Sequence, residues 1–446
     1  MAKEEKSGNE TNKKIVSLDI GSSKIGVFIG EILENGKVRI LGFGNPMMKK
    51  GDDNELEATV NALKKAVVDA ELSSGVDVKE VYVGIAGSSV RSLVSRARIP
   101  LRDFEGVVTK EAMNRVVEQT SQMVQYPADL DIIHVLPGDY SIDDREGIKN
   151  PLGMEGASLS VETLLVMAPR GIIRTIHKAV ESAGLVVKGL VLEQLADACC
   201  VLYKDEKELG VAIVDIGATS TDIAVFKDDK VVYTSSFNEA GNSITNDIAY
   251  GLTTPIESAE EIKKEHGTCF RSNLLDDSKF TVPGIGGRSG KECSTKHLAY
   301  IIYCQIYNIL MKVRADLEAQ NFLNKKKKTE NENPEEKGVF NGKDDVVKNL
   351  GAGIVITGGT AQLKGILELA EQIFDDVEVR LGAPQKNESG FSEILSMPLY
   401  STGVGLLNYA AQNEQPRGKR ETQTTKIVSA VGSKWKRFSS WIGQYI

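Results

Sequence analysis

The chain has 446 residues, of which 41% are hydrophobic and 26% charged, and its formal net charge at pH 7 is −8. This composition is typical of a globular protein of about three domains, and the acidic balance disfavours nucleic acid as the main partner, because Lys and Arg supply most of the affinity for phosphate backbones. The five cysteines lack C-x-x-C spacing and no segment holds 18 uninterrupted apolar residues, which disfavours a disulfide framework, a zinc site and a membrane span.

The N-terminal residues 1–14 are polar and lack the apolar core of a signal peptide, so we expect a disordered start and a reducing cytoplasm. Two antiparallel strands are predicted next, at 15–18 and 25–30, and the turn between them reads Asp19-Ile20-Gly21-Ser22-Ser23-Lys24. Glycine and small hydroxyl residues let backbone N–H groups approach a phosphate, and an aspartate can hold a hydrated divalent cation. A single such turn is also compatible with an ordinary hairpin.

A helix at 56–72 and a strand at 81–85 continue the frame of the first domain. From residue 86 to 163 the elements become shorter and richer in turn residues, which indicates an inserted subdomain. The frame is expected to resume with a strand at 164–168, a helix at 171–183 and a strand at 185–192. Glu193 and Gln194 then begin a short helix.

The hairpin pattern occurs a second time, after the strand at 211–214. The second turn reads Asp215-Ile216-Gly217-Ala218-Thr219 and leads through Asp222 into a strand at 223–226. Because self-similarity across nearly half a chain indicates a duplicated domain, two phosphate-binding turns predict one nucleotide held between two halves.

From Asn246 to about Phe322 the pattern is mainly helical, and residues 299–310 are predicted to form a buried helix. Residues 324–345 are highly charged and are expected to form a disordered surface loop. The glycine-rich stretch 286–291 fails the Walker pattern, with Ile285 and Glu292 at two required positions, so it is predicted to be a plain loop. The four histidines show no metal-ligand spacing.

A buried strand near residue 354 ends at the paired glycines Gly358 and Gly359 and is followed by Thr360, Leu363 and a helical pattern. Glycines at the carboxyl end of a strand allow a base and ribose to approach the backbone, which favours a nucleotide-binding turn here.

The C-terminal tail, 426–446, carries apolar residues at intervals of three or four with basic residues between them. Its expected membrane-binding residues are Val431, Lys434, Trp435, Arg437, Phe438, Trp441 and Ile442. Periodicity alone fits equally well a helix that packs on the protein's own core or on a partner subunit. The polar stretch 411–425 is predicted to be a flexible tether, and this favours reversible binding to an anionic membrane.

The two aspartate turns, the Gly358-Gly359 turn and the helices that begin at Glu193 and Ser401 occur in the order found in the actin, Hsp70 and sugar-kinase superfamily, which the chain resembles. Within it, the stretches 83–90, 252–255 and 283–288 and the tail resemble the FtsA family of bacterial cell-division actins. The resemblance implies an α/β fold of the duplicated actin/Hsp70-like ATPase type. It also implies an inserted subdomain, 1C, and a C-terminal amphipathic helix. The implied boundaries are 15–85 and 164–203 for subdomain 1A, 86–163 for 1C, 204–245 and 349–410 for 2A with a return to 1A, 246–348 for 2B, 411–425 for the linker and 426–446 for the helix.

The resemblance also implies a set of ligands and partners. ATP would be bound by the residues of the two turns, by Gly241 and Asn242, by Glu260 and Lys263 beside the adenosine, and by the Gly358 turn; Asp19 and Asp215 would position Mg²⁺, and Glu193 or Gln194 would orient water if hydrolysis occurs. The C-terminal peptide of the tubulin-like division protein FtsZ would dock on 2B, including around Arg288. The protein would form filaments, contact other divisome proteins through 1C, and lie on the cytoplasmic face of the cell membrane at the division site.

Two other functions remain open at this stage. A sugar or small-molecule kinase of the same superfamily would need a general-base carboxylate for an acceptor hydroxyl, and the sequence shows no clear candidate. A pilus-assembly relative of the family would not require the basic tail with its two tryptophans.

Overall fold

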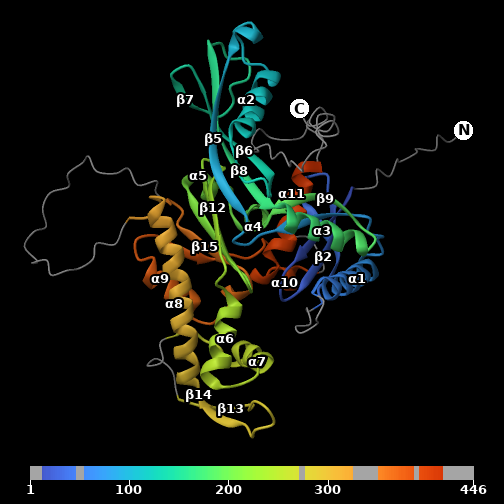
Figure 1. Ribbon diagram of the computed structural model, residues 1–446, viewed down its shortest axis with the longest axis vertical. Helices are drawn as coiled ribbons and strands as arrows, with labels where there is room; N and C mark the ends of the chain where they lie inside the picture. The colour runs from blue at the N-terminus through green and yellow to red at the C-terminus, as the bar shows by residue number, and fades with distance from the viewer. Residues whose placement is uncertain (1–12, 47–54, 271–276, 325–349, 386–390, 415–446) are drawn as a thin grey trace, which may run out of the picture. The chain divides into compact units, whose positions relative to one another are not determined.

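The computed structural model of the chain describes residues 13–46, 55–270, 277–324, 350–385 and 391–414 (Figure 1). They divide into two compact units, Met1–Val201 with Ala383–Ile446 (unit 1) and Leu202–Gly382 (unit 2). The membrane-binding tail and nearly all of the charged stretch 324–345 lie outside the described residues, as do residues 1–12.

Unit 1 is built on a five-stranded sheet of order β3-β2-β1-β4-β9. Its strands are β1 (Lys14–Ile20), β2 (Ile25–Ile32), β3 (Val38–Gly44), β4 (Glu80–Ile85) and β9 (Val186–Leu192). β1, β2 and β3 are antiparallel neighbours, whereas β1, β4 and β9 run parallel. Both faces of β1 and β2 are buried, which explains why these strands are nearly continuous apolar runs.

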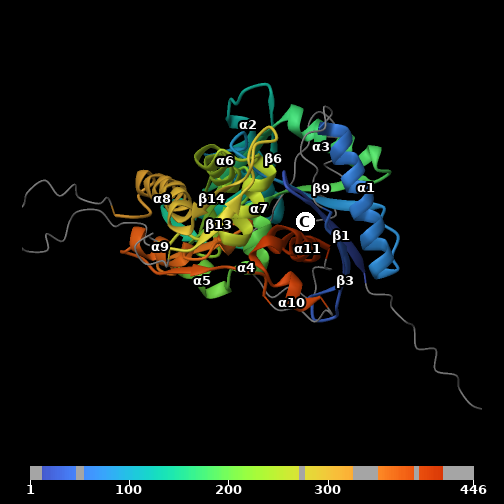
Figure 2. The same ribbon diagram turned by 90° about the horizontal axis from the view of Figure 1, so that it is seen from below.

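Helices cover both faces of this sheet. They are α1 (Glu55–Ser74), α3 (Arg170–Ser182), α4 (Glu193–Val201), α10 (Ser392–Leu395) and α11 (Ser401–Glu414), with a 3₁₀ turn at Pro398–Tyr400. Figure 2 shows α1 and α11 on opposite sides of the strands. α11 is buried almost throughout because two glycines let it approach its neighbours: a Cβ on Gly403 would lie 2.0 Å from the ring of Phe28, and one on Gly405 would lie 2.1 Å from the carbonyl oxygen of Ala196 in α4.

The inserted subdomain has its own four-stranded sheet, of order β5-β8-β6-β7, covered by α2 (Figure 1). Its elements are β5 (Arg91–Pro100), a 3₁₀ turn (Leu101–Phe104), α2 (Lys110–Met123), β6 (Leu130–Ile142), β7 (Arg145–Ile148) and β8 (Ser158–Pro169). Thr109 caps α2 by accepting a hydrogen bond from the N–H of Ala112 at 3.1 Å. Val116 on α2 packs with Leu101 and Leu159 in a separate core.

Unit 2 repeats the sheet of unit 1. Its strands are β10 (Val211–Ile216), β11 (Thr221–Lys227), β12 (Lys230–Phe237), β15 (Ile354–Thr357) and β16 (Val379–Leu381), in the order β12-β11-β10-β15-β16. The pairing directions match those of unit 1 strand for strand, and Asp19 opposite Gly26 corresponds to Asp215 opposite Asp222. The predicted duplication of the chain is therefore confirmed.

The helices of unit 2 are α5 (Lys204–Leu209), α6 (Gly241–Leu252), α7 (Ile256–His266), α8 (Thr295–Ala319) and α9 (Ile366–Ile373). A 3₁₀ turn, Gly359–Gln362, separates β15 from α9, and a hairpin is formed by β13 (Lys279–Val282) and β14 (Lys291–Ser294). α6 lies beside the long α8, and α7 packs against α6 (Figure 1). The predicted buried helix at 299–310 is the middle of α8.

Three sequence-based boundaries differ from the structure. We expect the insertion to end at residue 163, but β8 continues to Pro169 and pairs with both β5 and β6 along its length. We expect a mainly helical region from Asn246, but α6 begins at Gly241 and the β13–β14 hairpin intervenes. Residues 411–414, which we assign to the linker, form the last turn of α11, because Ala411 is buried there.

Replacing Gly405 with alanine is expected to lower the free energy of unfolding by about 1–3 kcal/mol, because the new methyl group would overlap the α4 backbone. Gly171→Ala is the matched control, since Gly171 also lies in a helix and has no atom within 4 Å of its ideal Cβ. Chemical denaturation midpoints measure the difference. Equal midpoints for the two variants would contradict this account of the α4–α11 contact.

Candidate functional site

In unit 2 the second aspartate turn is joined to two other segments by its backbone. The carbonyl oxygen of Gly217 accepts hydrogen bonds from the N–H of Gly241, at 3.1 Å, and from the hydroxyl of Thr360, at 2.8 Å. The N–H of Asn242 donates to the carbonyl of Ala218 at 2.6 Å. The turn, the start of α6 and the start of the 3₁₀ turn after β15 thus meet at one point.

Two glycines make this convergence possible. Gly358 has a φ of +91°, and a Cβ there would lie 1.9 Å from Oδ1 of Asp215. A Cβ on Gly241 would lie 2.7 Å from Oγ1 of Thr360. A side chain at either position would separate the segments, so the glycines are required by close approach and, at Gly358, by the positive φ.

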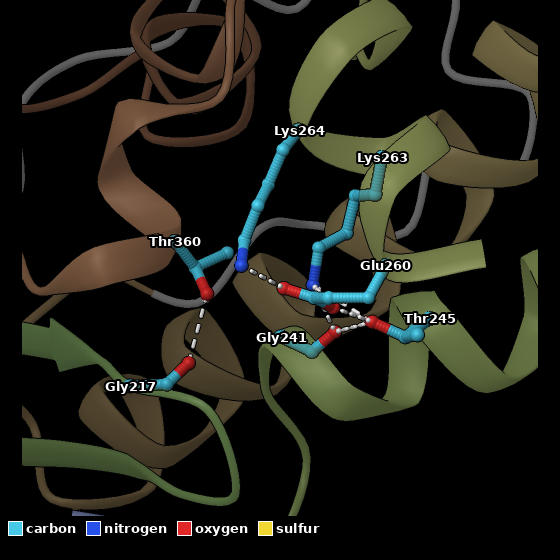
Figure 3. Close-up of polar contacts among 7 residues, drawn as sticks. All are labelled: Gly217, Gly241, Thr245, Glu260, Lys263, Lys264 and Thr360. Atoms are coloured by element: carbon cyan, nitrogen blue, oxygen red, sulfur yellow. Dashed lines mark hydrogen bonds and ion pairs between the residues drawn. The ribbon is translucent and has the colours of Figure 1, made fainter. Parts of the chain in front are cut away.

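A charged network extends from this point along α6 and α7 (Figure 3). Nζ of Lys263 donates to the carbonyl of Gly241 at 3.0 Å and to Oγ1 of Thr245 at 2.8 Å, and it lies 2.7 Å from Glu260. The Thr245 hydroxyl also lies 2.5 Å from Glu260, and Lys264 lies 3.3 Å from the second carboxylate oxygen. One carboxylate therefore binds both lysines beside the N-terminal turn of α6.

The carboxyl group of Glu260 is held in its charged form. Its partial burial would raise its pKa, but the hydrogen bonds from Lys263 and Thr245 and the charges of both lysines outweigh this, and the pKa is lowered. A lowered carboxyl pKa stabilises the folded protein at pH values above 4.5, the ordinary pKa of a glutamate. This stabilisation is lost as the pH falls through the lowered pKa.

The structure brings together Asp215, Gly217, Ala218, Gly241, Asn242, Glu260, Lys263, Gly358, Gly359 and Thr360 of the predicted set. Asp222 lies at the other end of the turn and accepts from the Ser220 hydroxyl at 2.6 Å. Leu363 is partly buried and packs against the core of unit 2. Thr245 and Lys264 were missed, and Thr245 would have been found by placing the helix start at Gly241, since it lies one turn further on.

The equivalent turn of unit 1 holds a buried carboxylate and a buried ammonium group. Asp19 is 6% exposed and Lys24 7% exposed. Burial raises the pKa of Asp19, and the charge of Lys24 opposes this effect. Lys24 donates to the carbonyl of Leu399, and its Nζ lies 4.6 Å from the centre of the Tyr400 ring. Gly21, Ser22 and Ser23 form the turn between them.

Glu193 and Gln194 begin α4 directly after β9, also in unit 1.

The expected membrane-binding residues lie outside the described residues. Within the described part of the chain, no three His, Cys, Asp or Glu side chains are grouped so that they could hold a metal ion, and no helix has the length and apolar character needed to span a membrane.

Two sheets of the same order, each with an aspartate turn after its first strand, define an actin-like ATPase fold. A solved structure of the PilM-PilN type IV pilus biogenesis complex has this fold, with a TM-score of 0.55 and 16% sequence identity over 88% of this chain and 98% of that one. The family model for cell division protein FtsA matches residues 212–405, and the model for the SHS2 domain inserted in FtsA matches residues 87–167.

Curated relatives extend the match to nearly the whole chain. Cell division protein FtsA of Pseudomonas aeruginosa is 37% identical over 91% of both chains, and that of Escherichia coli K12 is 35% identical over 96% of this chain and 97% of its own. FtsA of Bacillus subtilis is 31% identical over 92% of this chain and 86% of its own. The chain belongs to the FtsA family of cell division proteins.

Substituting glutamine for Glu260 is expected to lower the free energy of unfolding by about 1–2 kcal/mol at pH 7, because it removes charge-assisted hydrogen bonds to Lys263 and Thr245. The difference from the unsubstituted protein should shrink as the pH falls below 4.5, since Glu260 is then protonated first in the unfolded chain and, below its lowered pKa, in the folded protein as well. Glu261→Gln, at an exposed position on the same helix, serves as the control. Denaturation midpoints across pH 3–7 test this, and a pH-independent difference would contradict the assignment.

Proposed function

We propose that this cell division protein binds ATP, assembles into filaments, and anchors the FtsZ ring to the cytoplasmic membrane while it recruits further division proteins. The observation that carries the nucleotide part is the convergence of three segments on the Gly217 carbonyl, with the Glu260 network beside it. Family membership carries the division part.

In unit 2, the second aspartate turn and the Glu260 network carry the proposed contacts to the nucleotide. The N–H groups of Gly217, Gly241 and Asn242 donate to backbone carbonyls, so these residues shape the turn. Phosphate binding is proposed for the turn itself, where a glycine and small side chains let backbone N–H groups approach a phosphate. The Glu260 carboxylate would accept hydrogen bonds from the ribose hydroxyls, and Lys263 would keep it charged and oriented.

Mg²⁺ is proposed to bind with the phosphates, near Asp215 and Asp19. Both carboxylates are buried, and burial raises the pKa of Asp19, so a bound cation would favour its charged form. Oxygen ligands from carboxylates and phosphates are the ones that Mg²⁺ prefers. When bound, the ion would neutralise phosphate charge and support slow hydrolysis, with Glu193 or Gln194 as the residue that orients water.

Docking of the FtsZ C-terminal peptide is proposed for the side domain formed by α6, α7, α8 and the β13–β14 hairpin. Arg288 lies exposed in the loop of this hairpin, between Val282 and Lys291. Tyr250 is 91% exposed at the end of α6 and Tyr300 is 59% exposed on α8. Exposed aromatic side chains and an exposed basic residue in the same side domain suit a peptide that presents both apolar and acidic groups.

A kinase would need a general-base carboxylate for the acceptor hydroxyl. No described carboxylate supports that role. The likeness to PilM shows the fold alone, whereas the curated relatives above 30% identity are division proteins. The inserted subdomain is proposed to contact other divisome proteins and neighbouring subunits.

Asp215→Asn is expected to weaken Mg²⁺-dependent ATP binding at least tenfold, because it removes a charge from the proposed metal position and keeps the side chain's size where it packs against Gly358. Asp228→Asn is the control, since Asp228 is exposed and Asn also tolerates its φ of +53°. Equilibrium titration with a fluorescent ATP analogue, with and without EDTA, measures both. Unchanged binding by Asp215→Asn would remove Asp215 from the site.

Deletion of residues 429–446 is expected to abolish co-sedimentation with vesicles that contain anionic phospholipid, because it removes both tryptophans and the basic residues between them. The denaturation midpoint and ATP binding should stay the same as in the full chain. Trp435→Glu, which places a charge on the apolar face, should weaken binding in the intact tail. Undiminished sedimentation of the deleted chain would refute the membrane-anchor assignment.

A further inference from the structure

The side chain of His134 joins the inserted subdomain to the central sheet of unit 1. His134 lies in β6 and is fully buried. Its Nε2 accepts a hydrogen bond from the backbone N–H of Leu192 at 2.9 Å. Leu192 is the last residue of β9, the edge strand of that sheet. An imidazole from the insertion therefore takes the place of the carbonyl that a further strand would supply.

The strand that carries His134 is deformed at this position. The register of β6 against β8 shifts between Ile132 and His134, which is a β-bulge, and bulges redirect the side chains beside them. The ring of Tyr409 in α11 lies edge-on to the imidazole, with 6.4 Å between ring centres. Burial lowers the pKa of His134 to about 3, so the ring stays neutral and Nε2 stays an acceptor at physiological pH.

The donor of this hydrogen bond, Leu192, directly precedes the two residues proposed to orient water. Leu192 is followed directly by Glu193 and Gln194, and the Gln194 side chain is buried. A second contact comes from the strand that leads into the insertion: a Cβ on Gly84 in β4 would lie 2.9 Å from Oε1 of Glu193, so the Glu193 side chain lies over this glycine. The insertion thus contacts the last residue of β9, directly before the Glu193–Gln194 turn, and the central strand that leads into the insertion lies against Glu193.

We propose that His134 is a positioning residue that couples the inserted subdomain to the Glu193–Gln194 turn. This rests on the proposed nucleotide binding. Moving β6 away from β9 would leave the buried Leu192 N–H without an acceptor, and that cost makes β6 and the turn move together. Because such coupling is reciprocal, nucleotide binding alters β6, and a partner that displaces β6 alters nucleotide affinity by the same factor.

Hydrogen exchange of the full chain, with and without Mg-ATP, tests the coupling at two peptides, one in β6 (130–142) and one in α4 (193–201). His134→Leu removes the acceptor for the Leu192 N–H, whereas His134→Gln keeps an acceptor at the same distance along the side chain. His177→Leu, in α3 of the same unit and half-buried, controls for the loss of an imidazole. Titration with the fluorescent ATP analogue gives the nucleotide affinity of each variant.

In the unsubstituted chain, Mg-ATP is expected to slow exchange in both peptides. In His134→Leu, ATP should still slow exchange in α4, but its effect on β6 should fall at least fivefold. His134→Gln and His177→Leu should behave as the unsubstituted chain does.

Two results would overturn the proposal: an ATP effect on β6 that persists in His134→Leu, even if basal exchange there rises, or an ATP-binding chain that shows no ATP effect on α4. The first would mean that His134 only stabilises the fold, and the second that the turn does not respond to nucleotide. A failure of the unsubstituted chain to bind ATP is a different result, because it would refute the proposed nucleotide function and this inference with it.

Discussion

The carbonyl oxygen of Gly217 accepts hydrogen bonds from two segments that are far apart in the sequence, the N-terminus of α6 and the 3₁₀ turn after β15. Both bonds require glycine backbones at close range, since a Cβ on Gly241 or Gly358 would overlap its neighbours. The position of α6 also fixes the position of the Thr245 side chain, which forms hydrogen bonds with Lys263 and Glu260. The geometry of the candidate site in unit 2 therefore depends on this backbone junction more than on any single charged residue.

The strongest sequence predictions concern features whose signal is local. Each aspartate turn lies between two apolar strands, and the structure confirms both hairpins with equivalent pairing, Asp19 opposite Gly26 and Asp215 opposite Asp222. The repeat also predicts a duplicated domain, and the two sheets have the same strand order. Strand order outside the hairpins is decided by long-range pairing, and it could be inferred only from the resemblance to the superfamily.

The errors arise where a local pattern does not say which partner an element will choose. Residues 164–168 are as apolar as a strand of the central sheet, but they pair with β5 and β6 inside the insertion. β13 alternates polar and apolar residues over only four positions, and β14 begins with two charged residues, so the periodic signal of this hairpin is too short to mark it. Gly241 and Asn242 are residue types common in turns, which hides the first turn of α6 and the role of Thr245.

The inserted subdomain distinguishes this family from other proteins with the same fold. A duplicated nucleotide fold alone serves kinases as well as assembly proteins, and the site residues of unit 2 do not distinguish between them. The insertion has a core of its own and a buried histidine at its junction with the central sheet. The proposed account is that nucleotide binding sets the shape of an assembly protein, and chemistry on the nucleotide is secondary.

Isothermal titration calorimetry of the full chain with ATP, in the presence and absence of Mg²⁺, tests this account most directly. Because the two turns are proposed to serve one nucleotide, we expect one ATP bound per chain, and the affinity should fall at least tenfold when Mg²⁺ is withheld. Two sites per chain, affinity that does not depend on Mg²⁺, or no binding by a folded sample would contradict it.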